Sequence, residues 1–161
     1  LAPNPPLVEN KSLSSILTIE DIFSEWDKDS TIDQTELGGA ALNLAKLHHK
    51  YYRMLVNEKM ILRTHESNLK VLKLEKHEFF TQGPNEETQK KGWELPARGI
   101  ILKADIPMYM DADKDIINLS LKIGLQNEKV QALESIIKTI NAMGYNIKAA
   151  IDFQKFINGV G

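Results

Sequence analysis

The feature that most constrains this chain is a stretch with helical periodicity from residue 47 to residue 80. Gly83 and Pro84 must end the helix, and the sequence predicts that it covers about 42–82. At 1.5 Å per residue, about 35 residues span roughly 50 Å, so this helix needs packing partners along its length. Glu58 and Lys76 interrupt its heptad pattern. The heptad positions are Tyr51, Leu55, Leu62, His65, Leu69, Leu72 and Phe79.

The same stretch is basic. Between residues 46 and 76, eight Lys and Arg stand against three acids, a net charge of +5, although the whole chain carries −2 and residues 1–45 carry −6. A basic face beside a packing seam indicates contact with a polyanion, and off-seam aromatics could stack on bases. The alternative is an ordinary solvated helix face with the aromatic rings in the core. The candidate contacts are Lys50, Arg53, Lys59, Arg63, Lys70, Lys73, Lys76, Tyr52 and Phe80.

Lys70, Lys73 and Lys76 are spaced three residues apart, so they are expected to line one stripe of the helix. We therefore predict that the 70–76 end of the helix forms the centre of the contact with the polyanion.

A second long helix is predicted over about 112–143, with Gly144 as its cap and a third helix over about 145–158. Its heptad seam is apolar at seven of eight positions, Gln126 being the exception. This seam has more apolar surface than a small monomer can easily bury, which predicts a homo-oligomer. An intramolecular helical hairpin that covers the seam is the alternative. The predicted oligomerisation seam is Ile116, Leu119, Ile123, Val130, Leu133, Ile137 and Ile140.

The remaining segments are short or irregular. Residues 1–17 contain three prolines and are predicted to form an extended arm, outside a single domain over 18–160. Thr18 with Asp21 has the pattern of a capping box at a helix start. Residues 83–111 are rich in Gly and Pro and are predicted to form a connector. The fold class is therefore mainly α, with long helices and coiled-coil-like seams.

The sequence lacks the motifs that mark several classes of function. The chain has no cysteine and no apolar run of the ~18 residues that span a bilayer. The acids at 111–115 resemble a calcium loop, but Ile116 replaces its glycine and Lys122 its closing glutamate. There is no phosphate loop, no nucleophile elbow and no HExxH pair. We expect no enzyme, no metal and no cofactor.

Family-specific strings extend over about residues 17–160 and give a resemblance. They are LTIEDIFSEWDKDSTID, LHHKYY, LEKHEFFTQG, GWELP, ILKADIPMYMDADKDI, ESIIK and GYNIKAAIDFQKF. On these strings the chain resembles the UvsY family, the recombination mediators of T4-like bacteriophages, and most of all the versions from marine cyanophages.

The resemblance implies a protein without catalytic activity that acts in the host cytoplasm. It would bind single-stranded DNA, weaken the hold of the phage single-strand-binding protein and help to load the phage recombinase. It would form a ring-like homo-oligomer, a hexamer or heptamer. The family's basic DNA-binding segment corresponds to residues 70–76 here, with Lys76 nearest to a basic position of the family; Glu75 and a longer connector depart from the pattern. The alternative function is a structural coiled-coil adaptor that does not bind nucleic acid.

Overall fold

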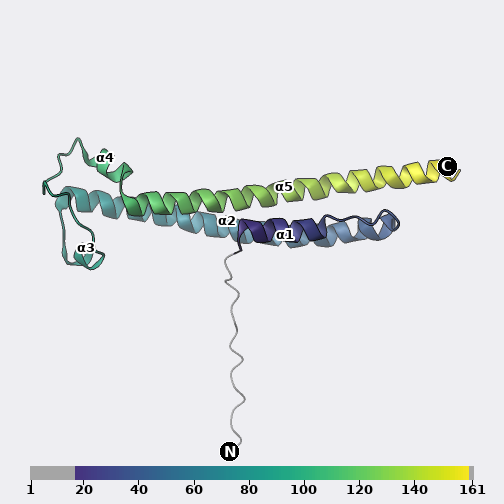
Figure 1. Cartoon of the computed structure of the whole chain (residues 1–161), viewed down its shortest axis with the longest axis horizontal. Helices are drawn as coiled ribbons and strands as arrows, with labels where there is room; N and C mark the ends of the chain where they lie inside the picture. Colours follow the sequence, from purple (N-terminus) through teal and green to yellow (C-terminus); the bar gives the residue numbers. More distant parts are fainter. Residues whose placement is uncertain (1–16, 160–161) are drawn as a thin grey trace, which may run out of the picture.

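The structure, a computed structural model, describes residues 17–159, so the predicted extended arm lies almost wholly outside it. Two long helices, α2 (Leu37–Gln82) and α5 (Lys114–Ile157), run antiparallel as a hairpin (Figure 1). The short helices are α1 (Ile19–Asp29), α3 (Glu86–Lys90) and α4 (Ile106–Asp111). Residues 17–159 contain no strand, and the mainly helical fold is confirmed.

The main core lies where α1 covers the hairpin. Tyr51 and Leu133 are fully buried between α2 and α5, and Ile22 of α1 is fully buried against them. Burying one large aliphatic side chain stabilises a fold by roughly 1.5–3 kcal/mol. The remaining buried members are Leu47, Leu55, Val130, Ile136 and Ile140.

Helix α1 begins at the predicted capping box. The backbone N–H of Asp21 donates to the Thr18 hydroxyl over 3.1 Å, and the Thr18 N–H donates to the Asp21 carboxylate over 2.9 Å. The ring of Trp26 then meets the ring of Tyr51 edge-on, with centroids 5.4 Å apart. Capping fixes where the helix starts, and the aromatic contact fixes how it lies on α2.

The predicted oligomerisation seam of α5 faces α2 of the same chain. Ile116, Val130, Leu133 and Ile140 are buried, and the other seam residues are half-buried. The hairpin therefore covers this seam without a second copy, which is the alternative that the sequence left open.

Helix α5 does not end at Gly144. The sequence predicted two helices separated there, but one helix continues to Ile157. Glycine inside a helix costs roughly 0.5–1 kcal/mol relative to alanine. Met143 and Ile147 are buried on either side of it, and this packing outweighs the local preference. Helix α2 likewise starts at Leu37, earlier than the predicted start at about residue 42.

The connector is more ordered than its composition predicts. Gly83 adopts φ +86°, which ends α2, and α3 and α4 follow in the segment that leads to α5. Phe79, Phe80 and Ile106 form a second, smaller core with partly buried residues of the connector. These residues are Trp93, Leu95, Ile101, Tyr109 and Met110.

Polar side chains interrupt the seam near the middle of the hairpin. Glu58, Gln126 and Lys129 are each about 5% exposed or less. The Gln126 amide donates to the Glu58 carboxylate and, over 2.9 Å, to the Glu58 carbonyl. The amine of Lys129 lies 4.0 Å from the same carboxylate. Because a buried charge without a partner is costly, these contacts favour one register of α2 against α5.

Candidate nucleic-acid interface

Acids from other elements neutralise part of the basic stretch. Three of its eight Lys and Arg form salt bridges: Lys50 with α1, Lys59 with Glu134 of α5, and Lys76 with the start of α5. The other five form no salt bridge within residues 17–159, and they are exposed. These five are Lys46, Arg53, Arg63, Lys70 and Lys73.

Lys50 holds α1 on the hairpin. Its amine lies 2.8 Å from Glu25 and 2.6 Å from Asp29, and the Tyr51 hydroxyl donates to the same Asp29 oxygen over 2.9 Å. The hydrogen bonds that Lys50 donates to Asp29 and Glu25 raise its pKa. Burial opposes the ionisation of Asp29, but its bonds from Lys50 and Tyr51 outweigh burial and lower its pKa. The Lys50 charge is therefore neutralised by acids of the same chain.

Lys76 lies in the interior, contrary to the expected exposed stripe. It is 4% exposed, and its amine lies 2.9 Å from Asp113, 2.7 Å from Asp115 and 4.0 Å from the centroid of the Trp93 ring. Asp113 also caps α5, because its carboxylate accepts from the Asp115 and Ile116 N–H groups. Lys76 thus joins the end of α2, the connector and the start of α5, and it cannot reach a phosphate in this conformation.

The exposed bases of α2 fall into two groups. Lys46 and Arg53 lie four residues before and three residues after Lys50, so helical spacing places them towards α1. The other group begins beyond Lys59, whose amine lies 2.7 Å from Glu134 of α5. It consists of Arg63, Lys70, Lys73 and His77, which we call the basic flank.

Helical spacing and packing place the basic flank along the α5 side of α2. Its members follow Lys59 at intervals of four, seven, three and four residues, which keeps side chains on one face. Lys73 and His77 share a hollow with Ser120 of α5. Lys59 and Lys73 are fourteen residues apart, and so are their respective α5 neighbours Glu134 and Ser120. The flank therefore follows the groove between the two helices for four turns.

Between Ser120 and Glu134, the α5 residues beside this groove have small or uncharged side chains. At helical spacing from Ser120, it presents Gly124 and Asn127. A Cβ added at Gly124 would meet nothing within 4 Å. Glu66 is the one acid at flank spacing on α2. Phosphates along this strip would be held by charge rather than by a specific pocket.

The two aromatic candidates have different environments. Tyr52 is 52% exposed and lies seven residues before Lys59, on the line of the flank. Its ring stacks on His48 with an interplanar angle of 11°. Phe80 is 9% exposed and packs on Phe79 and Tyr109, so the exposure that base stacking requires was predicted wrongly for Phe80.

Sequence reasoning missed two basic residues near the end of the flank. His77 follows Lys73 by four residues, a spacing that could have identified it. Lys103 comes from the connector and lines the same hollow, but no sequence pattern ties it to α2.

The fold is that of known recombination mediators. Three crystal structures of the bacteriophage T4 recombination mediator protein UvsY match with TM-scores of 0.69, 0.70 and 0.71 at 21%, 22% and 23% identity. The matches cover 86%, 84% and 86% of this chain and 97%, 98% and 96% of the T4 chains. A family model described as "Recombination, repair and ssDNA binding protein UvsY" matches residues 25–160. The chain belongs to the UvsY family. No curated protein sequence matches it.

Within residues 17–159, no three His, Asp or Glu side chains are placed to hold a metal ion. None of the described helices is apolar over a stretch long enough to cross a bilayer. All buried side-chain nitrogen and oxygen atoms of this part of the chain have hydrogen-bond partners.

Proposed function

We propose that this chain binds single-stranded DNA along the basic flank and mediates recombination by helping to load a phage recombinase onto DNA covered by single-strand-binding protein. The observation that carries the proposal is a row of exposed bases, Arg63, Lys70 and Lys73, that form no salt bridge within residues 17–159, in a chain of the UvsY family. The chain acts by binding and without catalytic turnover, in the cytoplasm of the phage's host.

The flank suits a protein that must hold DNA and then release it. Contacts between lysines and phosphates are independent of sequence and weaken as salt rises. The Lys59–Glu134 pair is about 40% exposed on both sides, so a phosphate can compete for this lysine at little cost. Glu66 within the row further limits the attraction.

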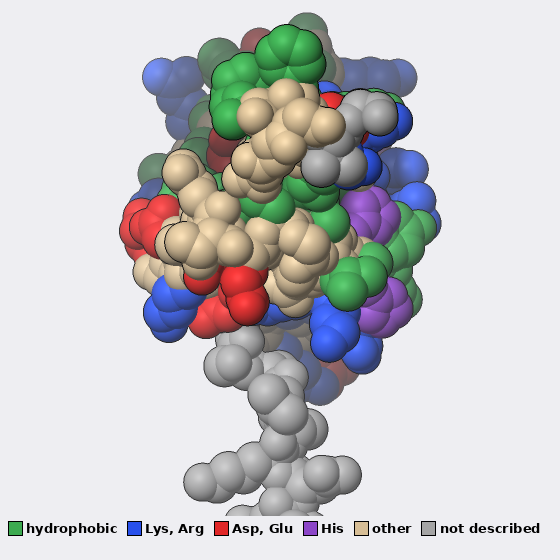
Figure 2. All heavy atoms as spheres, turned by 90° about the vertical axis from the view of Figure 1, so that its right-hand side faces the viewer, with side chains coloured by type: hydrophobic (Ala, Val, Ile, Leu, Met, Phe, Trp, Pro, Cys, Tyr) green, Lys and Arg blue, Asp and Glu red, His purple; other side chains and the backbone are tan. Residues whose placement is uncertain are grey.

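The working form is a ring-like homo-oligomer, of six or seven copies as the resemblance implies. Its contacts are the apolar side chains that the hairpin leaves exposed, in place of the predicted α5 seam. At the end of α5, Tyr145, Phe153 and Phe156 are 63–80% exposed, and apolar side chains gather at this end of the molecule (Figure 2). A ring presents the flank once per copy, which turns modest contacts into strong binding.

A titration of labelled oligonucleotides at increasing salt tests the proposal. Each neutralised phosphate contributes roughly 0.7 to the slope of log affinity against log salt. We expect a steep slope and similar affinities for oligonucleotides of different sequence. A complex of the expected mass that binds no oligonucleotide would support the alternative, a structural coiled-coil adaptor, which the neutralised Lys50, Lys59 and Lys76 favour.

A further inference from the structure

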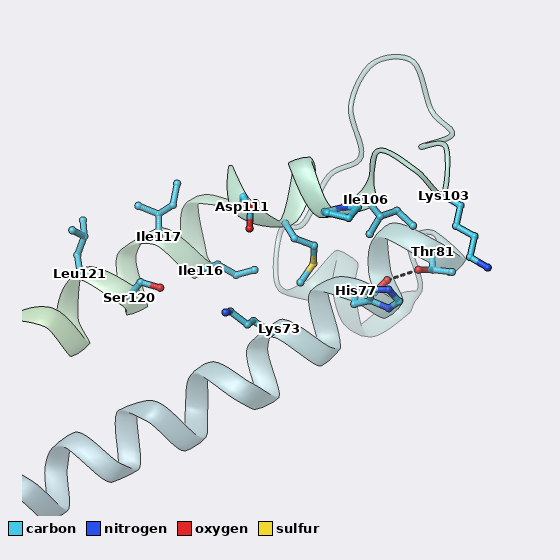
Figure 3. Close-up of a pocket in the computed structure, with 12 residues that line it drawn as sticks. Lys73, His77, Thr81, Lys103, Ile106, Asp111, Ile116, Ile117, Ser120 and Leu121 are labelled. Carbon is cyan, nitrogen blue, oxygen red and sulfur yellow. Dashed lines mark hydrogen bonds between the residues drawn. The ribbon is translucent and has the colours of Figure 1, made fainter.

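A hollow opens at the end of the basic flank. It has a volume of about 770 Å³ and lies between the end of α2, α4 and the start of α5. Lys73 points from α2 towards α5, and Ser120 points back towards it (Figure 3). Lys73 and His77 belong both to the flank and to the hollow, so the two surfaces are continuous.

The walls of the hollow are mainly apolar, and its rim is mainly basic. Ile106, Met110, Ile117 and Leu121 contribute aliphatic and thioether surface. Leu121 is 67% exposed and Ile117 is 40% exposed, so this surface is accessible from solvent. Lys73, His77 and Lys103 are the basic residues of the lining and Asp111 is its acid, and the Lys103 side chain points away from Lys73 and Asp111 (Figure 3). An apolar wall beside the Lys73 amine fits a ligand that has a flat apolar body and an anionic group.

We propose that this hollow binds one unstacked nucleotide of the single-stranded DNA held on the basic flank. The base lies against the aliphatic wall, and its phosphate lies beside Lys73. Asp111 repels the phosphate, and its carboxylate can accept a hydrogen bond from an exocyclic amine of the base. The Ser120 hydroxyl can donate or accept at the base edge. The proposal rests on the DNA-binding function proposed above.

Two observations favour a nucleotide over an acidic peptide. The hollow shares Lys73 and His77 with the flank, so a strand on the flank brings its bases to this opening. The wall is also formed mainly by aliphatic side chains, and aliphatic contact does not distinguish one base from another, as a mediator without sequence preference requires.

The test compares two oligonucleotides of equal length, one of thymidines and one with abasic sites throughout. Both have the same backbone charge, so we expect equal salt slopes, with at least about fivefold tighter binding of the thymidine strand. Leu121→Ala removes part of the wall and should reduce this preference. Leu125→Ala is the matched control, because Leu125 is 56% exposed one turn further along α5 and does not line the hollow.

Methionine methyl NMR on the intact complex locates the base. Met110 lines the hollow, whereas Met60 is 61% exposed and lies outside it. The thymidine strand should shift the Met110 signal and leave the Met60 signal in place. Equal affinities of the two strands with an unmoved Met110 signal overturn the nucleotide site while the DNA-binding function survives. A Met110 shift caused by a Glu- and Leu-containing peptide, and not by DNA, assigns the hollow to an acidic protein segment instead. Binding of neither strand contradicts the proposed function itself.

Discussion

Lys73 and Lys76 are one helical turn apart on α2, yet Lys73 is exposed and Lys76 is 4% exposed. The difference arises because the start of α5 and the connector cover only the second lysine. Asp113, Asp115 and Trp93 surround the Lys76 amine, whereas Lys73 faces an open hollow. Two residues with the same side chain therefore provide a matched pair for separating DNA contact from stability.

Lys73→Ala should weaken binding to single-stranded DNA and reduce the salt slope by about 0.7 for each copy in contact, since one phosphate contact is lost. Its melting temperature should match the wild type, because the side chain is exposed. Fluorescence titration and thermal unfolding of the same sample check both expectations. Unchanged affinity in an intact complex would remove Lys73 from the interface.

Lys76→Ala should destabilise the fold by about 3 kcal/mol, the cost of breaking a buried ion pair from one side. Asp113 would keep its charge at 11% side-chain exposure with no cation beside it. The midpoint of chemical denaturation measures this loss of stability, and Lys73→Ala is the control. An unchanged midpoint with weaker DNA binding would return Lys76 to the surface role that the sequence predicted.

The long helices could be predicted from the sequence because their periodicity extends over many turns. The heptad pattern of α2 and the stop at Gly83 depend only on local spacing, and the structure has both. The burial of Lys76 could not be foreseen, because it depends on Asp113 and Trp93, which come close only when the connector folds. The sequence around a lysine in a basic helix does not indicate which acids will pair with it in the folded chain.

The partner of the α5 seam was ambiguous for a similar reason. Ile123 and Val130 have the same pattern whether the facing helix belongs to their own chain or to another. The choice depends on whether α2 can fold back along α5, which the connector between Gly83 and Asp113 determines. The predicted DNA contacts of the exposed bases, Arg53 and Arg63 among them, stay predictions.

The polar cluster of the hairpin should show strong coupling between its members. Lys129→Met leaves Glu58 buried without its neighbouring cation, and Glu58→Leu leaves Lys129 alone, so each should destabilise the fold by about 3 kcal/mol. The triple variant Glu58→Leu, Gln126→Leu, Lys129→Met should recover most of this loss, because an apolar cluster needs no paired charge. Denaturant unfolding of the wild type, the triple variant and all three single variants, Gln126→Leu included, gives the coupling energy. Additive losses in the triple variant would mean that the three side chains act independently.

The exposed end of α5 should be required for assembly. Phe153→Ser with Phe156→Ser removes two aromatic side chains that are 63% and 80% exposed. We expect the native mass to fall towards that of one chain, with helical content retained because neither ring lies in the core. Light scattering and circular dichroism measure the two properties. Ile100→Ser is the control, at an 89% exposed residue of the connector, and should leave the mass unchanged. An undiminished mass in the double variant would place the interface elsewhere.

The attachment of α1 should depend on pH at both ends of the range. The folded pKa of Asp29 lies below its unfolded value, so its contribution to stability is present above the unfolded pKa, near 3.9, and is lost as pH falls through the folded value. The pKa of Tyr51 is raised by burial and by its bond to Asp29. Its contribution is therefore complete below its unfolded pKa, near 10, and is lost as pH rises through the folded value.

Asp29→Asn tests the acidic end directly, because asparagine keeps the shape and loses the charge that Lys50 and Tyr51 contact. At neutral pH the variant should be less stable than the wild type by about 1–2 kcal/mol, the scale of a hydrogen bond to a charged group. As pH falls below the unfolded pKa, near 3.9, and then through the lower folded pKa of Asp29, the carboxylate becomes protonated, so the difference should shrink. Thermal unfolding from pH 3 to pH 8 measures it, with Asp27→Asn as a control at an exposed acid two residues earlier. A difference that stays constant across this range would show that the contact between α1 and α2 does not depend on the Asp29 charge.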